Sequence, residues 1–167
     1  MFPLNRFALL IAVSAAAVYA QSPGTQNGAR IVVHVAGKPD STFTAADLSA
    51  LPHHSVTANE HGKQVEYEGV FLRDMLAKAG APFGSELRGK ALSTYVLASA
   101  RDGYAVVYTL TEMDPAFSEG DLLLADKSAG QPLPEKEGPF RIVAPHDKKP
   151  ARSLRMLERI DVVQVRQ

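Results

Sequence analysis

The sequence has neither cysteine nor tryptophan among its 167 residues, and its 18 basic and 18 acidic side chains cancel in formal charge. Without cysteine there is no disulfide framework, thiol nucleophile, zinc ribbon or iron–sulfur ligand. The balanced charge argues against nucleic acid as a partner, because phosphate contacts need a strongly basic surface. What is present, 46% hydrophobic and 22% charged residues, is typical of a folded globular chain with one domain.

The first twenty residues predict a secretory signal peptide. Arg6 supplies one positive charge, an apolar stretch runs from Phe7 to Ala17, and Val18 and Ala20 suit cleavage after Ala20. A membrane anchor is the alternative, but the apolar stretch is short for a span. We therefore expect an exported protein, periplasmic if the source is Gram-negative, with no membrane segment after cleavage. A flexible leader over residues 21–29 and a single domain over residues 30–167 complete the expected organisation.

Short β-branched or alternating segments predict a largely β fold. The hairpin signal Arg101-Asp102-Gly103 separates two segments that we expect to pair. The predicted strands are residues 31–35, 54–57, 65–68, 91–98, 104–110, 122–125, 140–144 and 160–165. Because strands outnumber helices, the predicted class is mixed α+β with a β-rich core.

The predicted helices are short. Over residues 71–79, apolar residues recur at helical spacing on one face and Gly80 is suited to end the helix. Thr44 with Asp47 predicts a capping box at the start of another helix. Thr111 with Asp114 predicts a third, ending near Phe117.

Few residues form a catalytic or metal-binding pattern. No serine stands in a nucleophile elbow, and Glu66 and Glu68 share one face of a strand, which indicates a solvated surface rather than an acid–base pair. The histidines lack metal-binding spacing such as HExxH, so we interpret them as surface or loop residues: His34, His53, His54, His61 and His146.

A late basic stretch is the strongest chemical feature. Lysine and arginine bind phosphate and other oxyanions through charge-assisted hydrogen bonds. The stretch contains Arg141, His146, Lys148, Lys149, Arg152, Arg155 and Arg159. From the residues alone, an anion site and a solvated charge run balanced by Asp147, Glu158 and Asp161 are equally consistent.

Four segments in order resemble the sulfite oxidase-type molybdopterin-binding domain. Residues 67–80, YEGVFLRDMLAKAG, resemble its Y-x-G-V-x-L-R-D-L-L-x-x-A-G segment, and residues 100–104, ARDGY, resemble its S-A-D-G-Y hairpin. Residues 130–145 resemble its G-x-P-L-P…G-G-P-x-R-L-V-V-P segment, and residues 152–160 its closing K-S-x-K-W-L-x-R-I. The resemblance spans roughly Thr44 to Val163.

This resemblance implies a β-rich sulfite oxidase-like fold and a molybdopterin cofactor whose phosphate meets basic residues. Arg152 and Arg155 stand where the family has lysines, and Arg141 matches its basic position after G-P-x. The implied cofactor-binding residues are therefore Arg152, Arg155, Lys149, His146 and Arg141.

One departure bears on function. Family enzymes hold molybdenum through a cysteine in a V-T-x-x-C segment, whereas residues 56–60 here read VTANE, so that Glu60 stands at the cysteine position. A carboxylate is a hard oxygen donor and a thiolate a soft one, so the two would not give a metal the same environment. We therefore expect molybdopterin as the cofactor without thiolate-bound molybdenum, and we name no metal ligand.

Three hypotheses follow. The favoured one is an exported binding protein for a pterin phosphate or another small anion. The second is a molybdenum-cofactor oxidoreductase with Glu60 or His61 near the metal. The third is an interaction protein that uses the fold only as a scaffold.

Overall fold

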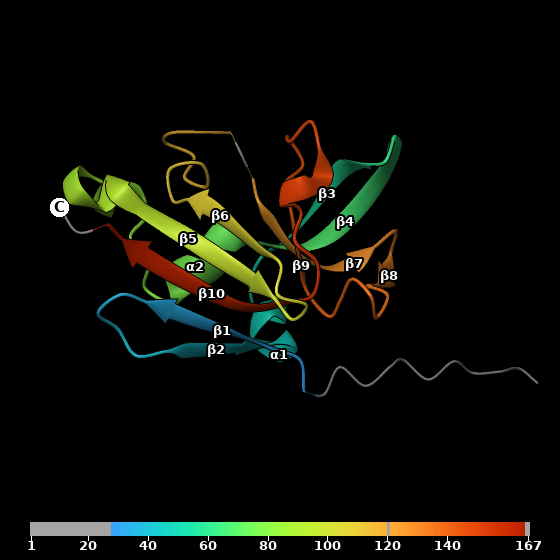
Figure 1. Cartoon of the computed structure of the whole chain (residues 1–167), viewed down its shortest axis with the longest axis horizontal. Helices are drawn as coiled ribbons and strands as arrows, with labels where there is room; N and C mark the ends of the chain where they lie inside the picture. Colours follow the sequence, from blue (N-terminus) through green and yellow to red (C-terminus); the bar gives the residue numbers. More distant parts are fainter. Residues whose placement is uncertain (1–27, 120, 166–167) are drawn as a thin grey trace, which may run out of the picture.

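The protein is described by a computed structural model over residues 28–119 and 121–165; the predicted signal peptide and most of the predicted leader lie outside the described residues. Figure 1 shows two β-sheets lying beside each other. The first, sheet A, has the strand order β2 (Ser41–Thr44), β1 (Arg30–Val35), β10 (Leu157–Gln164), β5 (Thr94–Ala100) and β6 (Ala105–Thr109). Strands β1 and β10 are parallel, and the other neighbours in sheet A are antiparallel.

The second sheet, sheet B, is antiparallel throughout. Its strands are β3 (His53–Glu60), β4 (Lys63–Phe71), β7 (Leu123–Ser128) and β8 (Gln131–Pro132), and β9 (Arg141–Val143) also pairs with β7. The predicted hairpin around Arg101-Asp102-Gly103 is confirmed, because β5 and β6 pair directly across it. Each predicted strand overlaps an observed one, whereas the sequence pattern predicts no strand at β2 or β8.

The helices are short, as predicted. Helix α1 (Ala45–Ser49) begins with the expected capping box between Thr44 and Asp47. Helix α2 (Leu72–Lys78) lies behind sheet A in Figure 1 and buries the predicted apolar face. Three 3₁₀ turns complete the described elements: η1 (Gly84–Glu86), η2 (Gly89–Ser93) and η3 (Pro150–Arg152). Within the described residues, no helix is long and apolar enough to cross a membrane.

The helix predicted from Thr111 to Phe117 is wrong, because this segment forms successive turns. The capping bonds involve a different pair: the Thr109 N–H donates to Glu112 Oε1 at 2.6 Å, and the Glu112 N–H donates to Thr109 Oγ1 at 3.2 Å. Asp114 is buried and accepts hydrogen bonds from the backbone N–H groups of Gly84 and Ala116. These bonds tie the segment to a distant loop instead of extending it as a helix.

Strand β7 separates two hydrophobic clusters. Leu122 and Leu124 pack into the larger cluster, which also contains the buried faces of sheet A and α2. Leu123 and Ala125 face the opposite way, into a smaller cluster. This follows from the two-residue period of a strand. On β9 the same period places Ile142 in the larger cluster and Val143 in the smaller one.

Gly69 permits the close approach of β4 to β7. A Cβ atom at this position would lie 2.1 Å from the backbone oxygen of Leu124, far inside van der Waals contact. A bulge between Glu68 and Gly69 shifts the register of the pair at this place. The glycine of the Y-x-G-V segment is therefore required by backbone packing.

Candidate functional site: a mixed-charge cleft

A tight hairpin places Glu60 at one end of sheet B. Strands β3 and β4 pair up to Glu60 and Lys63, so that only two residues form the turn. His61 and Gly62 both have positive φ angles, 54° and 87°, which is the backbone required by the two-residue turns that suit twisted strands. The Gly62 N–H donates to Asn59 Oδ1 at 2.7 Å and closes the turn. Glu60 is thus fixed by the hairpin.

Arg141 lies on β9, which pairs with β7 and not with β3 or β4, and its side chain reaches Glu60. The Arg141 side chain is 3% exposed, and its Nη2 donates to Glu60 Oε1 at 2.6 Å. Its Nη1 donates both to Glu137 Oε2 at 2.8 Å and to the Tyr67 hydroxyl at 2.9 Å. The guanidinium carbon lies 4.6 Å from the centre of the Tyr67 ring. One buried cation therefore joins β4, the β3–β4 hairpin and the loop before β9.

We call these four residues the Arg141 cluster: Glu60, Tyr67, Glu137 and Arg141. Their burial shifts the pKa of Tyr67, and their contacts balance the charge of Arg141. Burial raises the pKa of Tyr67 to about 12, with Glu60 and Glu137 adding to the effect and Arg141 opposing it. Tyr67 therefore stays a neutral hydroxyl through the physiological range. Two carboxylates offset the single guanidinium charge, which is what a buried cation requires. The Arg141 Nε is also buried, and none of the described residues accepts a hydrogen bond from it.

The Arg141 cluster forms part of the wall of a cleft of about 850 Å³. Three further cations line this cleft, Lys136, Lys149 and Arg155, and all three are exposed. Among the described residues, none pairs with these three cations. Asp102 and the exposed ring of Tyr104 also contribute to the lining. The cleft therefore contains both the ion-paired charges of the Arg141 cluster and three cations that pair with none of the described residues.

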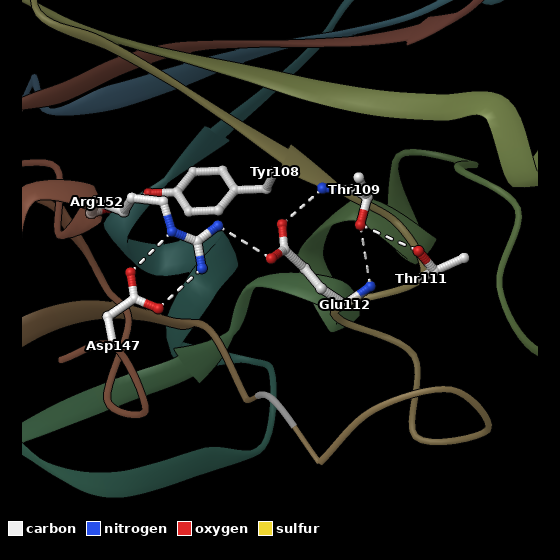
Figure 2. Close-up of polar contacts among 6 residues, drawn as sticks. All are labelled: Tyr108, Thr109, Thr111, Glu112, Asp147 and Arg152. Carbon is white, nitrogen blue, oxygen red and sulfur yellow. Dashed lines mark hydrogen bonds and ion pairs between the residues drawn. The ribbon is translucent and has the colours of Figure 1, made fainter.

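Arg152 and His146 line a smaller neighbouring pocket of about 130 Å³. Figure 2 shows the Arg152 guanidinium held between two acids. Its Nε and Nη2 donate to the two Asp147 oxygens at 2.8 and 2.9 Å, and its Nη1 donates to Glu112 Oε2 at 3.0 Å. These bonds, with Asp147 first, raise the pKa of Arg152 against the effect of burial. Arg152 is therefore permanently charged and already paired.

The structure thus divides the basic stretch that the sequence presents as one cluster. Arg141, Lys149 and Arg155 line the large cleft, whereas Arg152 and His146 line the small pocket. Arg159 lies on β10 and pairs with Asp161 at 2.6 Å. Arg152 and Arg159 pair with Asp147 and Asp161, as expected if they belong to a run of surface charges balanced by neighbouring acids. Lys149 and Arg155 have no such partner in the described residues and stay candidates for an anion site. The assignment of Arg152, Arg155, Lys149, His146 and Arg141 as cofactor-binding residues stays a prediction.

Histidines and acids do not gather into a metal centre within the described residues: no group of three or more metal-binding side chains converges there. His34 contacts Asp40 at 2.7 Å, and His54 stacks on Phe71 with ring centres 3.9 Å apart. His61 lies at the cleft, in the hairpin turn.

Sequence reasoning missed three residues of these networks, Tyr67, Glu112 and Glu137. Glu137 stands four residues before Arg141, a spacing that brings side chains together only when the backbone turns between them. Glu112 is 40 residues from Arg152, and Tyr67 is 74 residues from Arg141. The alternation along β4 marks Tyr67 as inward-facing, but no local pattern connects it to a cation.

Comparison with solved structures defines the class of fold. The chain is similar to the sulfane dehydrogenase SoxCD from Paracoccus pantotrophus, with a TM-score of 0.65 and 19% sequence identity. The similarity covers 83% of this chain and 39% of that one, so this chain spans about two fifths of the longer one. The predicted sulfite oxidase-like fold, β-rich with short helices, is confirmed by this match.

The family follows from the sequence itself. Residues 58–167 match the family model of the oxidoreductase molybdopterin binding domain, and the chain belongs to this family. The predicted family is therefore confirmed. No curated protein matches the chain. It is a molybdopterin-binding, oxidoreductase-like domain.

Proposed function

We propose that this chain binds a small anionic ligand in the large cleft, the phosphate of a pterin or another oxyanion, without thiolate-ligated molybdenum. The observation that carries the proposal is the pairing of Glu60 with Arg141 at 2.6 Å. Glu60 stands where the family resemblance puts the cysteine, and its carboxylate is already engaged by a buried cation. The chain would then be a binding protein rather than a catalyst of the sulfite oxidase type.

The cleft suits an anion of modest size. A volume of about 850 Å³ is within the range of small-molecule sites, roughly 300–1,000 Å³. Lys149, Arg155 and Lys136 carry exposed charges, and no carboxylate among the described residues forms an ion pair with any of them. The cations could therefore make charge-assisted hydrogen bonds with phosphate oxygens.

The donors near Glu60 do not fit a thiolate-type metal site. The sequence contains no cysteine, and the donors that the β3–β4 hairpin offers at the cleft are the Glu60 carboxylate, held by Arg141, and the His61 ring. Binding a metal through Glu60 would remove one of the two carboxylates that offset the charge of Arg141. We therefore derive no redox step for this chain.

Calorimetry with two probes, inorganic phosphate and a pterin monophosphate, tests the anion site. The double variant Lys149→Ala/Arg155→Ala should weaken the binding of both probes about tenfold or more, since each lost charge-assisted contact is worth roughly 1 kcal/mol. Wild-type binding should also weaken with added salt. Equal affinity in the wild-type protein and the double variant would refute the proposed site.

Metal analysis of protein purified from its natural host tests the second half of the proposal. We expect no stoichiometric molybdenum. Molybdenum and pterin in equal amounts with the protein would refute the proposal and restore the oxidoreductase hypothesis.

We also propose that the chain is exported, as its first twenty residues predict. The support is the sequence pattern alone, since these residues lie outside the described ranges. Mass spectrometry of the native protein should find Gln21 as the first residue, after cleavage behind Ala20. An intact Met1 in the native protein would contradict the proposal.

A further inference from the structure

We propose that Arg152 is a positioning residue for the cleft: it holds the loop that presents Lys149 and Arg155, and does not itself bind the anion. The inference rests on the proposed anion site and assigns a role within it. The family resemblance groups Arg152 and Arg155 as equivalent, but the structure gives the two side chains different surroundings. Arg155 is exposed at the large cleft, while Arg152 lies between two acids at the small pocket.

The side chain of Arg152 fastens the loop at two places. Its two bonds to Asp147 span the start of the loop, from residue 147 to residue 152. Its bond to Glu112 reaches the turn after β6, where Glu112 is itself held by the Thr109 N–H (Figure 2). The guanidinium carbon also lies 5.4 Å from the centre of the Tyr108 ring. The loop is thereby anchored to the edge of sheet A.

The backbone of the same loop is fastened by strand β6 and the residue before it. The Tyr108 hydroxyl donates to the backbone oxygen of Arg152, and the Tyr104 hydroxyl donates to that of Ala151 at 2.7 Å. The Ala144 N–H donates to Ser153 Oγ at 3.1 Å. The short turn η3 is thus held along its length.

The two exposed cations flank this fastened segment. Lys149 immediately precedes η3, and Arg155 follows it by three residues. A backbone that is ordered before the ligand arrives does not have to be ordered on binding, which improves affinity. Fixing η3 would therefore keep both cations at the cleft.

Neutralising one of the two acids beside Arg152 distinguishes a positioning role from a binding role, because the two roles predict opposite changes in phosphate affinity. Asp147 and Glu112 together carry two negative charges against the one on Arg152. If Arg152 bound the anion, the variant Asp147→Asn would free the guanidinium, remove a repelling charge and strengthen binding. If Arg152 positions the loop, the same variant loosens the loop and weakens binding.

The experiment compares variants by calorimetry, with inorganic phosphate as the probe. We expect Asp147→Asn and Glu112→Gln to weaken phosphate binding by about threefold or more, as loss of one charge-assisted hydrogen bond implies. Their salt dependence should be at least as strong as that of the wild-type protein, because no cation that contacts the anion is lost. Arg155→Gln should weaken both the affinity and its salt dependence. Arg159→Gln, which breaks a matched surface pair with Asp161, is the control and should change neither.

Hydrogen exchange of the ligand-free protein provides the second measurement. The Ser153 N–H, at the end of η3, donates to the backbone oxygen of Pro150 at 3.0 Å, and it should exchange faster in Asp147→Asn than in the wild-type protein. Tighter phosphate binding by Asp147→Asn, or unchanged exchange at Ser153, would overturn the positioning role. Absence of phosphate binding by the wild-type protein would instead refute the proposed function, while the exchange measurement would still judge whether Arg152 orders the loop.

Discussion

Removing carboxylates from the Arg141 cluster should destabilise the protein in a non-additive way. The variants are Glu60→Ala, Glu137→Ala and the double variant. The two acids are only about one-fifth exposed, at 20% and 21%, and both bond to a side chain that is 3% exposed. Arg141 keeps one carboxylate in each single variant and none in the double variant.

The expected losses in free energy of unfolding depend on how many carboxylates remain bonded to Arg141. A hydrogen bond to a charged group contributes about 1.5–3 kcal/mol when well buried. Because the acids are partly exposed and one partner remains, each single variant should lose about 1–2 kcal/mol. An unpaired buried charge costs about 3–5 kcal/mol, so the double variant should approach 5 kcal/mol. The excess over the sum of the single variants should therefore be about 1 kcal/mol or more.

Urea denaturation measures these free energies of unfolding. The control is Glu66→Ala, an exposed acid on the same hairpin without an ion pair in the described residues, which should stay within about 0.5 kcal/mol of the wild-type protein. If Glu60→Ala leaves the free energy of unfolding unchanged, the ion pair between Glu60 and Arg141 does not stabilise the protein. Strict additivity in the double variant would mean that the two acids do not share one cation. Either result would refute the reasoning on which the proposed metal-free site depends.

Two further predictions concern packing and titration. The variant Gly69→Ala should lose about 3 kcal/mol or more of its free energy of unfolding in urea, because its Cβ would meet the Leu124 backbone oxygen at 2.1 Å. The control is Gly28→Ala, where the added Cβ meets no described atom within 4 Å. A Gly69→Ala variant as stable as this control would contradict the packing argument. The folded-state pKa of Tyr67 is about 12, above the ordinary value of 10.0, so its contribution to stability is fully present below pH 10 and is lost as pH rises through about 12. Ultraviolet difference spectra of the wild-type protein and Tyr67→Phe should therefore show no tyrosinate from this residue at pH 10.5, and its appearance there would contradict the burial.

Much of the fold could be predicted because the strands and helix α2 carry local patterns. The capping box at Thr44 and the hairpin at Gly103 depend on neighbouring residues, and both are confirmed. The helix predicted after Thr111 is wrong for the opposite reason. Its Asp114 is buried against Gly84, 30 residues away, and that contact outweighs a local capping signal.

The candidate site was less predictable because its charges are neutralised across long sequence separations. Glu60 and Arg141 are 81 residues apart, and Arg152 and Glu112 are 40 apart. A run of basic residues shows how many cations are present, but not which of them already have partners. In this chain that distinction separates Arg155 from Arg152.

The parallel pairing of β1 with β10 has a consequence for how the chain is made. Strand β10 lies at the centre of sheet A, between β1 and β5, yet among the described strands it comes last in chain order and is synthesised after the others. Strand β1 therefore cannot pair with β10 until residues 157–164 have been synthesised, and pairing of such distant segments is slow. Until then Ile31 and Val33 cannot complete the cluster that they form with Ile160 and Val162, and apolar surface left exposed in this way favours aggregation of the nascent chain.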